Sequence, residues 1–306
     1  MASEIVPQAD AALQEPRRGE LLRLLWGDKF AAVSAIWLIL VIACALFAPM
    51  LLDGPATAMD LRARNAPPFE LERGFFFILG GDALGRSILA RLAVAAQNTI
   101  GIATAAVACA MLIGGFLGLI AGYVGGWIAG LIMRLADVVM SFPSLLLAVV
   151  VLYIFEPSVI SMIFVLAFTR IPLYLRTTRA EVLEIRERVF VAAAQVMGAG
   201  SGRILRRHIL PLVIPTLITI ATLDFAFVML VESALSFLGI GIQPPEMTWG
   251  LMVSQGRSYL STAWWLAFWP GLMIILTTMS LNLLSNWLRT VTDPEQRWRL
   301  EIGNRP

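Results

Sequence analysis

Charged residues, lysine and histidine are all scarce in this chain of 306 residues. Only 14% of the residues are charged, whereas 58% are hydrophobic. A typical soluble domain is about 25% charged. This composition excludes an ordinary water-soluble enzyme, because so many apolar side chains must be buried in membrane lipid. The net charge of +2 gives no reason to expect a nucleic acid as a partner.

The single lysine excludes a phosphate-binding loop of the kind found in ATPases. That loop needs a lysine between a glycine and a serine or threonine, whereas Lys29 stands between Asp28 and Phe30. One histidine, His208, and two cysteines cannot form an ordinary His/Cys metal site. We therefore expect no ATP site, no metal, no cofactor and no catalytic residue in this chain.

Long uncharged stretches predict six membrane-spanning helices. About 20 apolar residues cross the hydrocarbon core of roughly 30 Å as a helix. The first stretch is longer than a signal-peptide core, so we expect it to be retained. The stretch 92–133 is too long for one span, and the cluster of Gly122, Gly125 and Gly126 is expected to end the second. The predicted spans are 30–52, 98–123, 138–155, 159–175, 212–231 and 264–288.

The placement of arginine predicts the orientation of the chain. Connections rich in arginine stay in the cytoplasm, and residues 176–208 hold seven arginines against three glutamates. The connection 232–263 has Arg257 as its only basic residue. With six spans, both termini are then cytoplasmic. The expected parts are a cytoplasmic tail (1–29), a first span (30–52), an extracytoplasmic segment (53–91), a core of five spans (92–288) with a cytoplasmic loop (176–211), and a cytoplasmic tail (289–306).

The cytoplasmic loop combines alanines, glycines and a basic segment. The alanine run 192–194 favours a short helix with a slim face. Gly198 and two further glycines permit a sharp turn, a second, basic helix follows, and Pro211 begins the next span. We expect a helix–turn–helix knob that inserts into a cleft on another protein. The alternative is an ordinary loop whose arginines only set the topology.

The spacing in this knob resembles the cytoplasmic signature of ATP-binding-cassette importer permeases. That signature reads Glu-Ala-Ala, three residues, Gly, nine residues and Ile-x-Leu-Pro. Ala192 stands where glutamate is usual, and His208 where isoleucine is usual; the other positions match. By this resemblance, the residues that couple to an ATPase are Ala192, Ala193, Ala194, Gly198, Ser201, Arg203, Leu210 and Pro211.

Five further segments resemble the C-type membrane subunit of dipeptide, oligopeptide, nickel and glutathione importers. With the knob, the resemblance covers roughly residues 30–297. It implies an all-α membrane protein with six transmembrane helices, the type I ABC importer permease fold, in the bacterial inner (plasma) membrane. The five segments are Gly80–Ser87, Gly118–Gly126, Met133–Pro143, Glu232–Gly250 and Asn282–Pro294.

The same resemblance implies a transport complex. A second, homologous permease subunit would share the translocation path, and two ATPase subunits would bind ATP and Mg²⁺. An extracytoplasmic binding protein would deliver the substrate, and the knob would be the coupling helix. A di- or oligopeptide is the expected substrate by resemblance, while nickel chelates, glutathione, opines and sugars share the same scaffold.

Four residues are candidates for the translocation path or its gate. Asp224, near the middle of the fifth span, either lines the path or pairs with an arginine of the partner permease. Glu232, Pro244 and Pro245, expected in the external loop after that span, either form a gate beneath the binding protein or stiffen the loop. The alternative function is an ion-coupled secondary transporter that uses Asp224 and Glu232, although the inverted repeats common in that class are not visible.

Three other charges fall within or next to the predicted spans; a charge inside a span is costly and usually faces protein or water. Arg134 and Asp137 lie three residues apart and are expected to pair along one helix. Arg170, beside Pro172, is expected to extend its side chain towards the inner face of the membrane. A membrane-embedded enzyme would need a nucleophile and a base, and no such set can be assembled around the single histidine.

Overall fold

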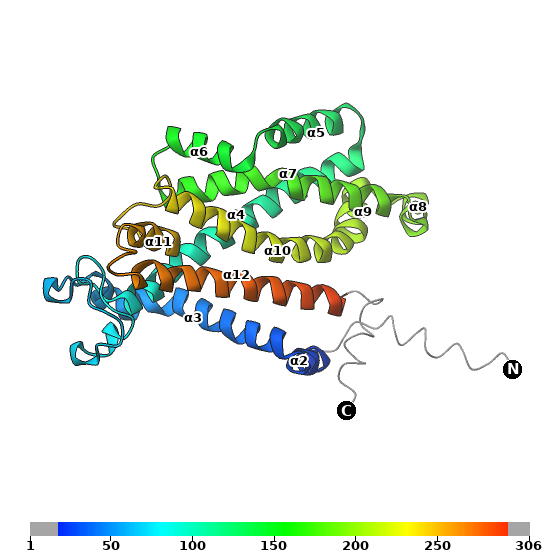
Figure 1. Cartoon of the computed structure of the whole chain (residues 1–306). Helices are drawn as coiled ribbons and strands as arrows, with labels where there is room; N and C mark the ends of the chain where they lie inside the picture. The colour runs from blue at the N-terminus through cyan, green and yellow to red at the C-terminus, as the bar shows by residue number, and fades with distance from the viewer. Residues whose placement is uncertain (1–17, 293–306) are drawn as a thin grey trace.

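The computed structural model describes residues 18–292, which form a helical bundle joined by loops. The long helices run side by side along one axis (Figure 1). The elements are α2 (Arg18–Gly27), α3 (Lys29–Thr57), η1 (Leu61–Ala63), η2 (Leu71–Arg73), η3 (Phe75–Phe77), α4 (Ile88–Val124), α5 (Gly126–Ser141), α6 (Ser144–Ile154), α7 (Val159–Arg186), α8 (Val189–Val196), α9 (Ser201–Ile204), a π-helical turn η4 (Leu205–Ile209), α10 (Leu210–Phe237), α11 (Trp249–Arg257) and α12 (Trp265–Thr292).

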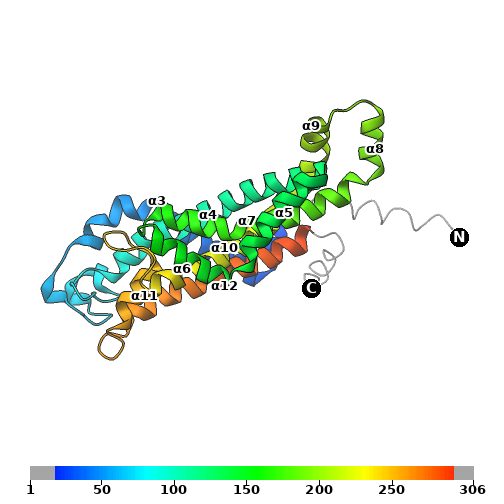
Figure 2. The same cartoon turned by 90° about the horizontal axis from the view of Figure 1, so that it is seen from above.

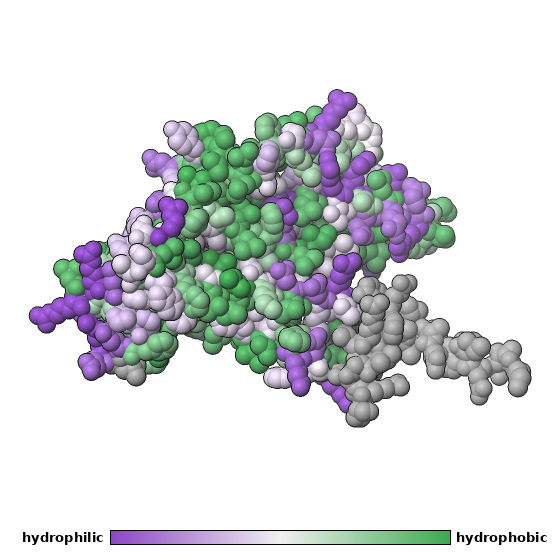
Figure 3. All heavy atoms as spheres, viewed as in Figure 1, coloured by the Kyte–Doolittle hydropathy of each residue, from purple (hydrophilic) through white to green (hydrophobic). Residues whose placement is uncertain are grey.

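Five helices in the described part are long and apolar enough to cross a membrane, and a bent pair makes up to six. The five are α3, α4, α7, the continuous run Ser201–Phe237, and α12. Large apolar side chains on α3, such as Ile39 and Met50, are 67% and 84% exposed. Figure 3 shows hydrophobic residues across the middle of one face and hydrophilic residues gathered towards its ends, as a lipid-embedded surface requires.

The third predicted span, 138–155, is not one straight helix. It is divided between α5 and α6, which are bent by 89°. The break falls at Phe142 and Pro143, and Phe142 has an extended backbone. Proline disfavours a helical conformation at the residue before it and donates no backbone hydrogen bond. The sequence pattern therefore located the apolar residues correctly, but Pro143 divides them between two short helices.

The second and fourth predicted spans are longer in the structure than the sequence indicated, since α4 begins at Ile88 and α7 continues to Arg186. The glycine cluster ends α4 as expected, at Val124, where Gly125 follows with a φ of +68°. Glycines along one face of α4 let its backbone approach that of α7. A Cβ added to Gly118 would lie only 2.6 Å from the Leu175 carbonyl oxygen. At Gly122 it would lie 2.6 Å from Cβ of Val182. Small residues four apart are a common device for close helix packing in membranes.

Replacing Gly118 with alanine should separate α4 from α7. We expect a loss of about 1–3 kcal/mol in unfolding free energy, because the added methyl group overlaps the Leu175 carbonyl. Gly101 is the matched control on the same helix, since a Cβ there meets nothing within 4 Å. Gly101→Ala should gain up to about 1 kcal/mol from helix propensity. Thermal unfolding of the detergent-solubilised chain measures both, and equal effects of the two substitutions would contradict this packing account.

The first, fifth and sixth predicted spans correspond to α3, α10 and α12, each a few residues longer than expected. Asp28 begins α3 by accepting the backbone N–H groups of Phe30 and Ala31, at 3.0 and 3.2 Å. The predicted tails, 1–29 and 289–306, lie largely outside the described residues. Within the first of them, the described helix α2 precedes α3.

The two ends of the bundle differ in structure. At one end α8 and α9 stand away from the long helices, as Figure 2 shows, and we call residues 189–209 the knob. At the opposite end lie the connection 58–87 and α11 (Figure 1). There, the backbone N–H of Trp249 donates to Thr99 Oγ1 at 3.0 Å, and its indole N–H donates to the Leu92 carbonyl at 2.9 Å. These bonds fix α11 on α4.

Candidate functional site: the knob and the charges within the bundle

The knob has the expected helix–turn–helix form. Helix α8 ends at Val196, and Gly198 follows with a φ of +82°. The N–H of Gly198 donates to the Gln195 carbonyl at 2.9 Å, and the N–H of Ala199 donates to the Ala194 carbonyl at 3.0 Å. This pair of bonds is the Schellman motif, which ends a helix with a left-handed residue and favours glycine there. Gly198 therefore sets the direction in which the chain leaves α8.

The predicted coupling residues are divided between an exposed surface and an anchored base. Ala194 is buried with Val191, so one face of α8 packs on the protein. Ile204 and Ile209 are also buried, in the core cluster of the bundle. Leu210 is half-buried. The exposed members are Ala192, Ala193, Gly198, Ser201, Arg203 and Pro211.

The tip of the knob is apolar. Val196 and Met197 are 90% and 81% exposed, and they come directly before Gly198. Sequence reasoning did not select these two residues, although two large apolar side chains beside a turn glycine were a usable signal. Two small alanines and two large apolar residues form a surface that no described part of the chain covers. Exposed apolar patches of this kind mark sites where another protein binds.

The base of the knob is joined to the long helices on both sides. The Arg186 guanidinium, at the end of α7, donates to the Gly122 carbonyl of α4 at 3.1 Å. On the other side, α9 continues through η4 into α10, a run counted as one apolar helix from Ser201 to Phe237. Pro211 provides no N–H to the preceding turn, which accounts for the wider π-helical turn just before it. A force on the knob can therefore move both α7 and α10.

The charge of Asp224 has a partner within this chain and does not need an arginine from another chain. Its carboxylate forms an ion pair with Arg170 of α7. It also accepts a hydrogen bond of 3.0 Å from the Tyr174 hydroxyl, one turn further along α7. The Asp224 side chain is 1% exposed and that of Arg170 is 21% exposed. The Arg170 guanidinium lies 4.4 Å from the centre of the Phe227 ring.

Two sequence-based interpretations of the membrane charges are therefore wrong. Arg170 was expected to reach the inner face, but α7 extends to Arg186, so that Arg170 lies in mid-helix and turns to Asp224 instead. Asp137 was expected to pair with Arg134, but it pairs with Arg176 of α7. In both cases a neighbouring helix brings an opposite charge into reach, α10 for Arg170 and α7 for Asp137.

Glu232 lies inside α10 and not in the loop after it. The helix continues to Phe237, and the Glu232 side chain is completely buried. The Ser236 hydroxyl donates to its Oε1 at 2.8 Å. Pro244 and Pro245 do lie in the connection between α10 and α11, and both are exposed. The structure therefore separates Glu232 from the two prolines and does not bring it together with Asp224 in one site.

Comparison with known proteins identifies relatives that cover most of this chain. Residues 114–298 match the family described as binding-protein-dependent transport system inner membrane component. Residues 19–68 match the N-terminal TM domain of oligopeptide transport permease C.

Individual relatives cover most of the chain. A di/tripeptide transport system permease protein of Pseudomonas aeruginosa is 38% identical over 88% of this chain and 89% of its own length. A probable D,D-dipeptide transport system permease protein of Escherichia coli is 34% identical, over 90% and 91%. A glutathione transport system permease protein of Pectobacterium atrosepticum is 32% identical, over 94% and 93%.

Proposed function

The chain belongs to the family of inner membrane components of binding-protein-dependent transport systems, and from this we propose that it is the permease subunit of an ATP-driven importer of di- or oligopeptides. As a permease of this family it is a multi-pass inner membrane protein and not itself an enzyme. The peptide substrate is supported by the relatives named for di/tripeptide and D,D-dipeptide transport. The glutathione permease is similar over 94% of the chain, and glutathione is itself a peptide.

We propose that the complex has the composition implied by the family resemblance. A second, homologous permease subunit shares the path, two ATPase subunits bind ATP and Mg²⁺, and an extracytoplasmic binding protein delivers the substrate. The knob and both termini face the cytoplasm, and the segment 53–91 faces outward. The arginines of the loop 176–211 support this orientation, since basic connections stay inside.

The observation that carries the proposal is the uncovered apolar tip of a knob that is anchored to two long helices. Met197 and Val196 are exposed at the tip, while Ile204 and Ile209 hold the base in the core. An ATPase groove that encloses the tip would bury the exposed apolar area. Closure of the ATPase subunits around ATP would then pull on α7 and α10 together. Gly198 and the alanines are the coupling residues because they leave the tip narrow.

We keep a role at the path for the other candidates, in a revised form. Pro244 and Pro245 are exposed at the end opposite the knob, where a docked binding protein would contact them. The partly exposed guanidinium of Arg170 faces the path, and buried Asp224 holds it in place. Glu232 supports the end of α10 from which the connection to the prolines begins.

Co-purification from cells that also express the neighbouring subunits tests the proposal. We expect the ATPase subunits to purify with the tagged wild-type chain, and Met197→Glu to lose them, because a carboxylate at the tip would be buried without a partner. Phe75→Glu is the control, since Phe75 is 69% exposed but lies in the connection 58–87, away from the knob. A chain that purifies alone and moves solute down an ion gradient would contradict the proposal and favour the secondary transporter.

A further inference from the structure

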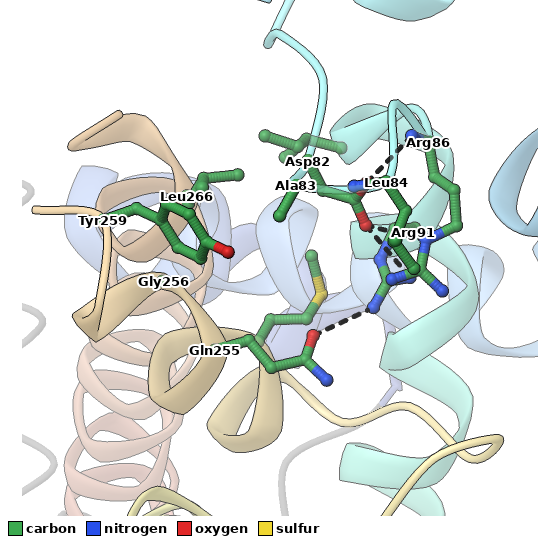
Figure 4. A pocket seen from close by; sticks show the side chains of 11 residues that line it. Asp82, Ala83, Leu84, Arg86, Arg91, Gln255, Gly256, Tyr259 and Leu266 are labelled. Carbon is green, nitrogen blue, oxygen red and sulfur yellow. Dashed lines mark hydrogen bonds and ion pairs between the residues drawn. The ribbon is translucent and has the colours of Figure 1, made fainter. Parts of the chain in front are cut away.

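A second site lies at the end of the bundle opposite the knob. Here the connection 58–87, the beginning of α4, α11 and the beginning of α12 enclose a cavity of about 320 Å³ (Figure 4). This volume falls at the low end of the range of roughly 300–1,000 Å³ that small-molecule sites occupy. None of the coupling or path residues discussed above lines it.

One carboxylate in this cavity faces two guanidinium groups. Asp82 Oδ2 accepts a hydrogen bond of 2.7 Å from Arg86 Nε and lies 3.3 Å from Arg91 Nη1. Asp82 Oδ1 is occupied by the backbone N–H groups of Leu84 and Arg86, each at 2.8 Å. Asp82 is the only acidic residue among those that line the cavity, and Arg86 and Arg91 are the only basic ones. The lining therefore carries one surplus positive charge.

The surplus charge is held on a buried side chain. The Arg91 side chain is only 3% exposed. Its Nη2 donates to Gln255 Oε1 at 3.3 Å, while Nη1 is buried and makes no hydrogen bond with any described residue. The partner of Nη1 is Asp82 Oδ2 at 3.3 Å, an ion-pair contact that this oxygen shares with Arg86. One carboxylate thus balances two guanidinium groups, and an unbalanced buried charge is costly. The cavity therefore lacks a second negative charge beside Arg91.

The other side of the cavity offers a further donor. The Tyr259 hydroxyl points into the space between α11 and Arg91 in Figure 4. No described residue accepts a hydrogen bond from it. The position of Asp82 is fixed by three hydrogen bonds within the turn 82–86, so the guanidinium groups are oriented in advance. Pre-organised donors around an apolar lining are typical of binding sites for small polar groups.

We propose that this cavity binds the carboxylate of a small solute, with Arg91 and Tyr259 as the donors. One carboxylate neutralises the one surplus charge, and its planar pair of oxygens matches the planar donor fork of a guanidinium. The transported peptide, through its C-terminal carboxylate, is the first source, and this identification rests on the proposed function. A free carboxylic acid is the other source, and the carboxylate site itself does not depend on peptide transport.

The experiment uses the assembled transporter in lipid nanodiscs, without the binding protein. Calorimetry measures the binding of the dipeptide Ala-Ala, of its C-terminal amide, and of acetate. We expect Arg91→Gln to weaken Ala-Ala at least tenfold and Tyr259→Phe to weaken it about threefold. The amide should bind to wild type as weakly as Ala-Ala binds to Arg91→Gln. Arg64→Gln, an exposed arginine of the same connection that lies outside the cavity, should leave binding unchanged.

The outcomes separate the site from the transport function. Acetate that competes with Ala-Ala in wild type but not in Arg91→Gln supports the site with a free carboxylate as the source. The inference is overturned if the amide binds as well as the acid, or if Tyr259→Phe and any folded Arg91 variant bind like wild type. If uptake assays with the binding protein show no peptide import while acetate still binds through Arg91, the peptide function fails and the site stands.

Discussion

Replacing Gly198 with tryptophan is expected to abolish substrate uptake, while the assembled complex continues to hydrolyse ATP. Apart from the neighbouring residues in the chain, no described atom lies within 4 Å of a Cβ built on Gly198, so the new side chain begins in open space. We propose that the ATPase groove encloses the tip and therefore meets the added indole. Uptake of labelled peptide into proteoliposomes and phosphate release from the same preparation measure the two activities side by side.

Two alanine variants in the same turn distinguish the effect of an added methyl group from the effect of backbone strain. Gly198 has a φ of +82°, so Gly198→Ala carries a strain of about 1–2 kcal/mol in the turn. Gly200 has a φ of −67°, which alanine adopts freely. We expect Gly198→Ala to reduce uptake several-fold and Gly200→Ala to leave it near wild type. Undiminished uptake by Gly198→Trp would remove the knob from the coupling mechanism.

Asp224→Ala should be among the most destabilising substitutions within the bundle. It leaves the Arg170 guanidinium, which is 21% exposed, without its carboxylate. Breaking one partner of a buried ion pair costs about 3–5 kcal/mol, and we expect the melting temperature of the purified chain to fall by about 10 °C. Tyr174→Phe removes only the hydrogen bond of 3.0 Å to Asp224 and should cost about 1 kcal/mol.

The double variant Arg170→Met, Asp224→Leu tests what the pair contributes besides stability. Apolar residues in place of a buried pair often restore stability, so its melting temperature should lie near that of wild type. Under our proposal it still loses peptide uptake, because the guanidinium at the path is gone. Wild-type uptake by the stable double variant would show that Arg170 and Asp224 serve packing alone. A double variant no more stable than Asp224→Ala would contradict the ion-pair account.

Sequence alone could predict the membrane class, the apolar segments and the knob. The membrane class follows from composition, because a chain in which 58% of the residues are hydrophobic needs lipid around it. The knob is a local feature, since the alanine run, the turn at Gly198 and the restart near Pro211 lie within about twenty residues. Local backbone preferences determine such a feature, and the Schellman motif at Gly198 shows how. The resemblance to importer permeases combines this local spacing with five further segments of the chain.

Tertiary structure alone decided which charges meet. Asp224 and its two partners on α7 are about fifty residues apart, and Arg91 and Gln255 are 164 apart. Such pairs depend on the rotation and depth at which two helices pack, and a span pattern contains neither. For α4 and α7, the close contact at Gly118 and Gly122 sets this rotation and depth. Burial of Glu232 and the charged cavity at Arg91 likewise depend on how helices pack, because hydrophobic periodicity tells where helices form and not which side chains they bring together.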